Sequence, residues 1–411
     1  MKKLFLSIMA ITALGFVTSC SSDDNTPVVV DDGPQGEVIT KTGLLTANET
    51  WTANNIYILD GKVVINEGVT LTIEPGTIIK GAQGQDTQAS ALIVDQGGKL
   101  IADGTASEPI IFTSILDNIA VGQTAGTNLT VEDSGLWGGV LVLGRAPISV
   151  SGDLLTNQIE GIPANEPFGQ YGGNISNDNS GIIRYVSIRH GGIAIGQDNE
   201  INGLTLGGVG SGTIIDHVEV VANQDDAFEW FGGTVNASNL LAWGQQDDGL
   251  DVDQSYSGTI SNAVVIQTAN SDRAIEIDGP EGSAATYASF TMNSITLIGN
   301  AANAFYADYR DGARGSFNNV LAYGFGADAK IRFNGQASQD NFVNGIISFS
   351  NWQIVLPAGV PNVGALLVNT PAGSETNFTS HATAIANPSA ATVGANLGVF
   401  TWTFASQKGA L

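Results

Sequence analysis

Cysteine, histidine and basic residues are scarce in this sequence. It contains 1 Cys, 3 His and 15 Lys and Arg residues, against 40 Asp and Glu residues. A single cysteine excludes a disulfide within the chain, so burial alone has to hold the core together. Binding of nucleic acid relies on Lys and Arg contacts to phosphate. The excess of acidic residues therefore excludes nucleic acid as a partner.

Long apolar runs are also missing, apart from one near the start of the chain. Lys2 and Lys3 precede an apolar run over residues 4–17, which is too short to span a bilayer as a mature helix. This pattern predicts a signal peptide over residues 1–19. Without it, 13 basic and 40 acidic residues remain, which gives a net charge of −27.

The cysteine follows this segment directly. Residues 17–20, Val-Thr-Ser-Cys, resemble a bacterial lipobox, which implies that Cys20 is lipidated. An ordinary secretory signal beside a stray cysteine is the alternative. Residues 21–25 resemble the acidic export signal of Bacteroidetes lipoproteins, which implies anchoring on the outer face of the outer membrane. Residues 20–40, rich in Ser, Asp, Pro and Gly, predict a flexible linker, so the lipid would be the only contact with the membrane.

Helical apolar stripes are absent from the rest of the chain, whereas glycine is abundant. The 52 Gly residues and the many short runs of Val, Ile, Leu and Thr predict short strands joined by tight turns. We expect one all-β domain over residues 41–411. A chain of this length is long for one compact core, but a solenoid avoids that limit because it grows along one axis.

One short pattern is written three times between residues 218 and 279. Asp225 recurs as Asp247, 22 residues on, and as Asp272, 25 residues on. Apolar and acidic residues alternate within each copy, and alternate residues of a strand face opposite sides. The repeat therefore predicts stacked strands of a solenoid, with apolar side chains such as Phe228 inward and acids such as Glu229 outward.

The stacked acids pose an electrostatic problem. Glu229, Asp251 and Glu276 would lie in one column, and like charges on adjacent strands are destabilising. The preceding copy has Thr205 at this position. Ca²⁺ would relieve the repulsion, because it takes six to eight oxygen ligands, largely carboxylates and carbonyls. A solvated acidic face and the carboxylate pair of a glycosidase are the alternatives.

Several motifs carry a resemblance to a known fold. Residues 69–81 (VTLTIEPGTIIKG), 98–105 (GKLIADGT) and 136–144 (LWGGVLVLG) resemble the pectin-lyase-like superfamily and its exported Bacteroidetes members, which are mostly uncharacterised. The resemblance implies an all-β, single-stranded right-handed parallel β-helix. Two polar stretches, residues 122–134 and 151–180, predict loop insertions, which in solenoids often lie beside the binding face. Residues 400–404 predict a cap strand or a short cover over the C-terminal end.

The acidic repeat carries a second resemblance. Residues 247–251, Asp-Asp-Gly-Leu-Asp, resemble the calcium-binding element of family 9 pectate lyases. This resemblance implies Ca²⁺ ligands at Asp226, Asp247, Asp248 and Asp251. Leu250 replaces an aromatic residue of that element, and no lysine stands where the family has its catalytic base. Arg273 is the substitute for that base, or else a structural counter-ion of the acids.

Further residues of the repeat, and Tyr306 and Arg310 one coil later, are candidates for a ligand groove. Aromatic rings among them offer flat faces to sugars, and the charged members would line the same side of the coil. For Trp243, packing in the core or on the surface is the alternative. The groove candidates are Glu229, Trp243, Asp253, Asp272, Glu276, Tyr306 and Arg310.

The function that these features favour is non-catalytic. We expect a surface-exposed outer-membrane lipoprotein, a β-helix that binds a polysaccharide with the help of Ca²⁺ or acts as a scaffold for another surface partner. It would act as a monomer or within a surface complex. A calcium-dependent polysaccharide lyase, acting on pectate-like substrates, is the alternative. A lyase leaves unsaturated ends that absorb in the ultraviolet, and a binding protein leaves none.

Overall fold

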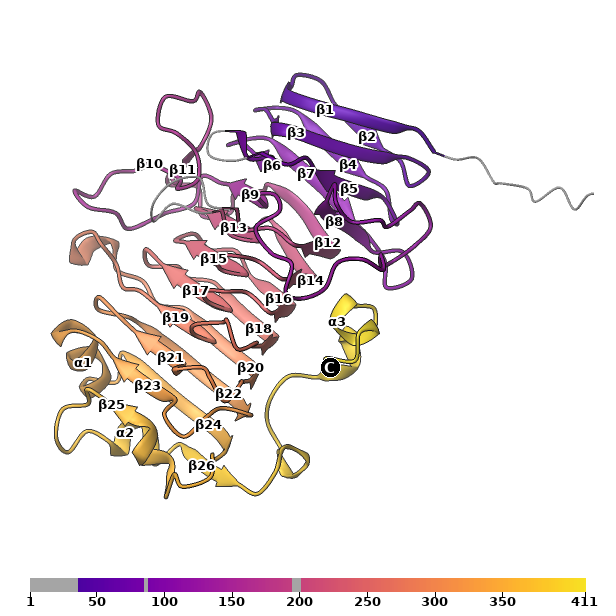
Figure 1. Cartoon of the computed structure of the whole chain (residues 1–411). Coiled ribbons are helices and arrows are strands. Elements are labelled where there is room, and N and C mark those ends of the chain that lie inside the picture. The colour runs from indigo at the N-terminus through magenta and orange to yellow at the C-terminus, as the bar shows by residue number, and fades with distance from the viewer. Residues whose placement is uncertain (1–35, 85–87, 194–200) are drawn as a thin grey trace, which may run out of the picture. The chain divides into compact units, whose positions relative to one another are not determined.

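The fold is a right-handed parallel β-helix, as the sequence predicts (Figure 1). A computed structural model describes residues 36–84, 88–193 and 201–411. Within these ranges one sheet contains 24 strands, and every pairing in it is parallel. The predicted signal peptide over residues 1–19 and Cys20 lie outside the described residues. No helix in the described part is long and apolar enough to cross a membrane.

One stack of short strands forms the face that carries the acidic repeat, and we call it the groove stack. Each of its strands pairs with the next member in the stack. The members are β6 (Ala91–Val94), β9 (Val140–Leu143), β13 (Leu204–Gly207), β15 (Phe228–Phe231), β17 (Leu250–Asp253), β19 (Ile275–Ile277), β21 (Phe305–Tyr309), β23 (Lys330–Phe333) and β25 (Leu367–Val368).

The other two faces are built largely from long strands. The first of these long strands is β12 (Gly181–Arg189). Its first half pairs with β7 (Lys99–Asp103), and its second half pairs with β8 (Ile110–Ser114). A long strand of this kind therefore serves two faces of the coil. The long strands are β12 (Gly181–Arg189), β14 (Ile214–Val221), β16 (Ala237–Trp243), β18 (Thr259–Ile266), β20 (Thr291–Ile298), β22 (Gly315–Tyr323) and β24 (Ile347–Val355).

Each long strand is interrupted at one residue with left-handed backbone. Asn239, Asn262 and Asn319 have φ of 56° at these points, and asparagine tolerates this region better than most residues. The side chains also link neighbouring coils, because Asn262 Nδ2 donates a 2.7 Å hydrogen bond to Asn239 Oδ1. These interruptions let one strand turn from one face to the next.

The first coils and the last strand complete the sheet. Their members are β1 (Val38–Leu45), β2 (Glu49–Trp51), β3 (Ile56–Ile65), β4 (Thr70–Ile73), β5 (Ile78–Gly81) and β26 (Ala382–Ile385). The first strand begins at Val38, inside the predicted linker over residues 20–40.

The core is a set of inward ladders along the coil axis. Phe228 pairs with Leu250 and Leu250 with Ile275, and all three side chains are fully buried. Trp230, two residues after Phe228, is also fully buried, in the neighbouring ladder. The predicted inward orientation of the apolar set is confirmed.

The two predicted insertions leave the coil where the sequence indicates. Residues 122–134 contain no strand, and residues 151–180 contain only a two-stranded antiparallel hairpin of β10 (Asn157–Gln158) and β11 (Gln170–Tyr171). Each insertion thus replaces a tight turn between coils.

The described helices are short, and all but one of them lie in the C-terminal region, after residue 335. The α-helices are α1 (Gln336–Val343), α2 (Thr376–Thr379) and α3 (Phe404–Gln407), and the 3-10 helices span Ala284–Thr286, Val363–Leu366, Pro388–Ala390 and Leu397–Phe400. Phe378 of α2 is fully buried and stacks edge-on against Trp352 at a centroid distance of 5.4 Å. The last coils are therefore covered by α2.

Residues 400–404 form no strand, and they lie on the side of the coil instead of over its C-terminal end, so the prediction of a terminal cap there is wrong. Residues 392–411, which we call the C-terminal strap, run back along the side of the coil toward β14 (Figure 1). Glu219 on β14 accepts hydrogen bonds from the backbone N–H groups of Phe404 and Ala405 at 2.9 and 2.8 Å. Phe400 packs on Leu241. The strap takes this path because its apolar and backbone partners lie on the side of the coil.

Candidate functional site

The outward positions of the groove stack form a column of carboxylates. Glu229 pairs with Asp251, Asp251 with Glu276, and Glu276 with Asp308. Thr205 precedes this column and Arg332 follows it. Arg332 forms an ion pair with Asp308. The acids therefore stand in register, as the sequence predicts, and the column ends in a basic residue.

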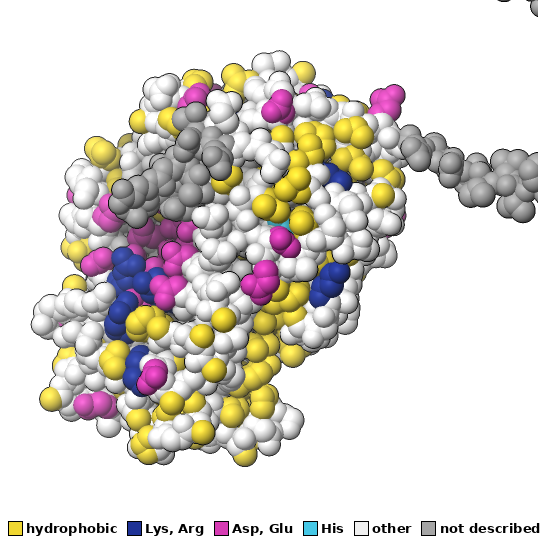
Figure 2. Space-filling view, viewed as in Figure 1, with side chains coloured by type: hydrophobic (Ala, Val, Ile, Leu, Met, Phe, Trp, Pro, Cys, Tyr) yellow, Lys and Arg dark blue, Asp and Glu magenta, His cyan; other side chains and the backbone are white. Residues whose placement is uncertain are grey.

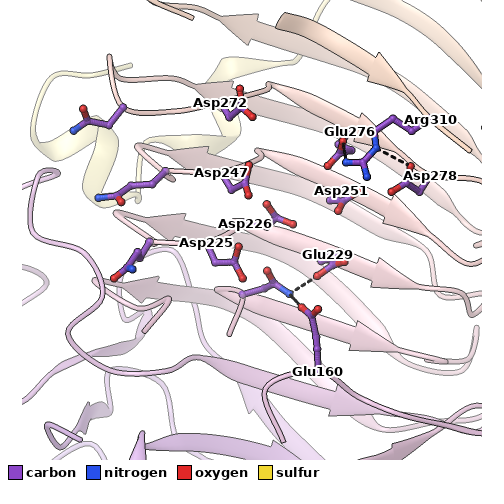
Figure 3. A pocket seen from close by; sticks show the side chains of 14 residues that line it. Glu160, Asp225, Asp226, Glu229, Asp247, Asp251, Asp272, Glu276, Asp278 and Arg310 are labelled. Atoms are coloured by element: carbon purple, nitrogen blue, oxygen red, sulfur yellow. Dashed lines mark hydrogen bonds and ion pairs between the residues drawn. The ribbon is translucent and has the colours of Figure 1, made fainter. Parts of the chain in front are cut away.

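The turns before these strands carry a second set of acids. Asp226 Oδ1 accepts a 2.7 Å hydrogen bond from the backbone N–H of Asp248, and Asp248 Oδ1 accepts a 2.9 Å bond from the backbone N–H of Arg273. Each carboxylate thus fixes the turn of the following coil. Asp225, Asp247 and Asp272 stand in line beside them (Figure 3).

These side chains border an open groove of about 670 Å³. Acidic side chains gather in a hollow on one face, with basic side chains at one edge (Figure 2). The lining residues are Glu160, Asn202, Gln224, Asp225, Asp226, Glu229, Gln246, Asp247, Asp251, Asn270, Asp272, Glu276, Asp278 and Arg310.

Burial makes the charged forms of these acids unfavourable. Loss of hydration, together with the neighbouring carboxylates, raises the pKa values of Asp226, Glu229, Asp248 and Asp251 well above the ordinary range. Burial also raises the pKa of Asp278 to about 7, although Arg310 acts in the opposite direction. The predicted repulsion between the stacked acids is therefore present in the folded chain.

Two groove carboxylates have an oxygen without a hydrogen-bond partner in the described part of the chain, and one of these oxygens, Oδ1 of Asp278, has an ion pair with Arg310 instead. Oδ1 of Asp251 accepts no hydrogen bond within the described part of the chain, and the residue is only 8% exposed. A buried acceptor without a partner is costly. Because Asp251 lines the groove, this oxygen is available to a ligand that enters there.

Arg273 is held among the acids as their counter-ion. Its Nη1 lies 3.5 Å from Asp247, 3.1 Å from Asp248, 3.0 Å from Asp272 and 3.4 Å from Glu276. Burial alone would lower the pKa of Arg273, but these carboxylates raise it above its ordinary value. Ion pairs with four carboxylates favour the charged guanidinium, so these surroundings suit a structural counter-ion better than a catalytic base.

Two of the predicted groove residues lie elsewhere. Trp243 ends β16 on another face, where its ring packs on Phe404 of the strap at 6.1 Å. Tyr306 points inward, is fully buried and stacks on Phe325 at 3.9 Å. Its direction follows from a register shift in β21, where Phe305 and Ala307 pair with consecutive residues of β23. Neither ring faces the groove.

The remaining predicted residues are brought to one face. Glu229, Asp272, Glu276 and Arg310 line the groove together with Asp226, Asp247 and Asp251. Arg310 forms ion pairs with Glu276 and, at 3.3 Å, with Asp278. Asp253 follows on β17 but is not a lining residue, and Asp248 lies behind the lining, fully buried against Arg273.

The insertions contribute side chains that the repeat does not reveal. Glu160, from the second insertion, accepts a 3.2 Å hydrogen bond from Nδ2 of Asn202, which also donates to Glu229. Ser134, from the first insertion, accepts a 2.7 Å bond from Gln246. The position of the insertions beside the binding face was the one sequence signal for these contacts.

Among the residues that the structure describes, four groups of three carboxylates are close enough to hold a cation, each with oxygens within 4.8 Å of one another. The groups are Asp225, Asp226 and Asp247; Asp226, Glu229 and Asp251; Asp247, Asp248 and Asp272; and Asp248, Asp251 and Glu276. The four predicted calcium ligands, Asp226, Asp247, Asp248 and Asp251, are thus distributed over all four groups. Their oxygens and the orphaned Oδ1 of Asp251 suit a hard cation such as Ca²⁺.

The stacked parallel strands and the acidic groove define a β-helix with an anionic site on one face. Residues 43–406 match the family model described as a pectate-lyase like beta helix domain, and the chain belongs to this family. No curated protein and no solved structure matches the chain.

Proposed function

We propose that this chain binds a polysaccharide through Ca²⁺ held in the acidic groove, without cleaving it. The observation that carries the proposal is the groove itself, an open surface lined by buried carboxylates that repel one another. A bound divalent cation would neutralise them and present open coordination positions to sugar oxygens. Membership of the pectate-lyase-like family supports a role connected with polysaccharides.

The lining residues favour Ca²⁺ among the divalent cations. They offer carboxylate and amide oxygens, with no His or Cys among them. Such all-oxygen sets suit Ca²⁺, which accepts irregular geometry and many ligands, whereas Mg²⁺ demands a near-ideal octahedron.

The state of Arg273 favours binding over cleavage. A lyase needs a base that removes a proton from the sugar, and no lysine is among the described residues that line the groove. The pKa of Arg273 is raised by its carboxylate partners, so it stays protonated. Cleavage by the alternative lyase activity would therefore need a base other than Arg273.

The first experiment compares thermal unfolding with Ca²⁺ and with chelator. Ca²⁺ at about a hundredfold excess over its Kd stabilises the folded state by about 2.7 kcal/mol if it binds that state alone. We expect a raised Tm, reversed by chelator and largely lost in Asp251→Asn. Sodium chloride is the control, because salt screens the repulsion without a specific site. Equal stabilisation by sodium chloride would contradict the proposal.

The second experiment tests the ligand. Binding to a panel of neutral and acidic polysaccharides is measured with and without chelator, and ultraviolet absorbance is followed at the same time. Calcium-dependent binding with no gain in absorbance is the expected result. A gain that depends on Ca²⁺ would establish the lyase instead.

We also propose that the protein is a lipoprotein anchored at Cys20 and exposed at the surface of the outer membrane. The lipobox over residues 17–20 and the acidic stretch after it support this proposal. Mass spectrometry of the native N-terminus is expected to find a diacylglycerol on Cys20. Membrane retention of the Cys20→Ser variant would remove the anchor, and protease treatment of whole cells tests surface exposure.

A further inference from the structure

The four carboxylate groups of the groove form two pairs related by one coil. Asp226, Glu229 and Asp251 make up one group, and the same positions one coil later are Asp248, Asp251 and Glu276. We call these two the upstream site and the downstream site. Their side chains are all more than nine-tenths buried. The sequence repeat has therefore produced two nearly equivalent acidic sites that share Asp251.

The two sites differ in their basic neighbours. Arg310 pairs with Glu276 at the edge of the downstream site, and Arg273 lies within that site. The guanidinium of Arg273 lies 3.1 Å from Asp248 and 3.4 Å from Glu276, so a positive charge already occupies the downstream site. In the described ranges, neither Asp226 nor Glu229 forms an ion pair with a Lys or Arg side chain. The third copy of the repeat has Arg273 where the first two have Asp226 and Asp248.

The polar contacts of the upstream site prepare it for a ligand. Asn202 donates to Oε2 of Glu229, and Asp226 Oδ1 is fixed by the backbone N–H of Asp248. Oδ1 of Asp251 has no hydrogen-bond partner among the described residues. An oriented pair of carboxylates beside a buried, unpartnered carboxylate oxygen is an independent sign that the site takes a cation.

We propose that the groove binds one divalent cation, at the upstream site, and that the guanidinium of Arg273 stands in the place of a second. This inference rests on the proposed calcium binding, and it specifies where Ca²⁺ binds and how many ions bind. Neighbouring coils are about 4.8 Å apart, and metal pairs bridged by ligands lie about 3.5–4 Å apart. Two cations sharing Asp251 are thus sterically possible once the guanidinium is removed.

The decisive measurement is the number of Ca²⁺ ions bound by the full chain in isothermal titration calorimetry. The wild type is expected to bind one ion and Arg273→Gln two. Arg314→Gln is the matched control, because it removes a positive charge that has no ion pair with the groove acids in the described ranges, and it should still bind one. One ion bound by Arg273→Gln, or two by the wild type, would overturn the inference.

A second pair of variants locates the ion without altering Arg273, and decides the matter if Arg273→Gln does not fold. Glu229→Gln removes a ligand of the upstream site and should weaken Ca²⁺ binding by more than about tenfold. Even the loss of a residue that only hydrogen-bonds to a metal ligand typically lowers metal affinity by about 10- to 100-fold. Glu276→Gln removes a downstream acid and should leave binding within a few-fold. The reverse order would overturn the inference while leaving calcium binding intact. Absence of saturable binding to the wild type would instead refute the proposed function, and with it this inference.

Discussion

At the scale of single residues, the buried carboxylates fall into two kinds. Asp226 and Asp248 each accept the backbone N–H of the next turn, so they stabilise the coil as well as the groove. Asp251 lacks such a bond at Oδ1. Replacement of Asp251 should therefore affect ligand binding more than folding, whereas replacement of Asp248 should affect both.

The pKa values predict how the protein without metal responds to pH. The pKa of Asp278 is raised to about 7, and that of Asp251 is raised by burial and by Glu276. A folded state that holds protons more tightly than the unfolded state loses stability as pH rises. For Asp278 this loss extends from the ordinary carboxyl range near 4 to about pH 7.

We therefore expect Tm in chelator to fall between pH 5 and pH 8, measured by thermal denaturation. Asp278→Asn and Asp251→Asn should each make the fall smaller, because they cannot ionise. The readout is the difference between the wild type and each variant in how far Tm falls with pH, because the other titrating groups are the same in both proteins. Excess Ca²⁺ should remove most of the difference. An equal fall in Tm for the wild type, Asp278→Asn and Asp251→Asn would mean that folding does not raise the pKa values of these two acids.

Residue-level prediction from sequence succeeded where alternation is regular and failed where it is interrupted. The acids at positions 229, 251 and 276 follow strict alternation and were predicted correctly to stand in one outward column. Tyr306 is expected to continue this column one coil later, but the register shift in β21 turns its side chain inward. No local pattern announces that shift.

At the scale of elements, the inward ladders should dominate the stability of the coil. Leu250 is fully buried between Phe228 and Ile275. Leu250→Ala should lower the free energy of unfolding by about 2–5 kcal/mol, the usual cost of such a cavity. Urea denaturation measures it, with Leu154→Ala as control, because Leu154 is 60% exposed on the second insertion. Comparable effects of the two changes would contradict the role of the ladder.

The elements of the coil were easier to predict than their connections. Runs of β-branched residues that end in turns containing Gly predicted the strands. The spacings of 22 and 25 residues predicted that these strands stack on one another. The interruptions at Asn239 and Asn262 were not predicted, because a single asparagine inside a strand pattern does not by itself indicate left-handed backbone. Glu160 was missed because the insertion has no repeat to align it with the groove.

At the scale of the whole molecule, charge is distributed unevenly along the coil. Arg273, Arg310 and Arg332 all lie toward the C-terminal end of the acidic columns, where they form ion pairs with the last acids. Asp226, Glu229 and Asp251 form no ion pair with a Lys or Arg side chain in the described part of the chain. This asymmetry explains why a cation site is expected at one end of the groove only.

The strap is the other feature of this scale, and Glu219 is its main attachment. Its carboxylate accepts two backbone N–H groups of the strap and the hydroxyl of Ser187. Hydrogen bonds to a charged group contribute about 1.5–3 kcal/mol each. Glu219→Gln should therefore lower the free energy of unfolding by at least about 1.5 kcal/mol, the contribution of one such bond. Urea denaturation measures the loss, with the exposed Glu375→Gln as control. Equal midpoints for the two variants would show that the strap contributes little.

The path of the strap also affects the kinetics of folding and unfolding. Phe404 contacts Glu219, 185 residues earlier, and Gln407 contacts Thr124, 283 residues earlier. Coils can be added one after another, each on its predecessor, but the strap docks only when the coils beneath it are complete. Interactions that form after the transition state act on the rate of unfolding and hardly on the rate of folding. The strap should thus set how long the folded protein lasts once it has formed.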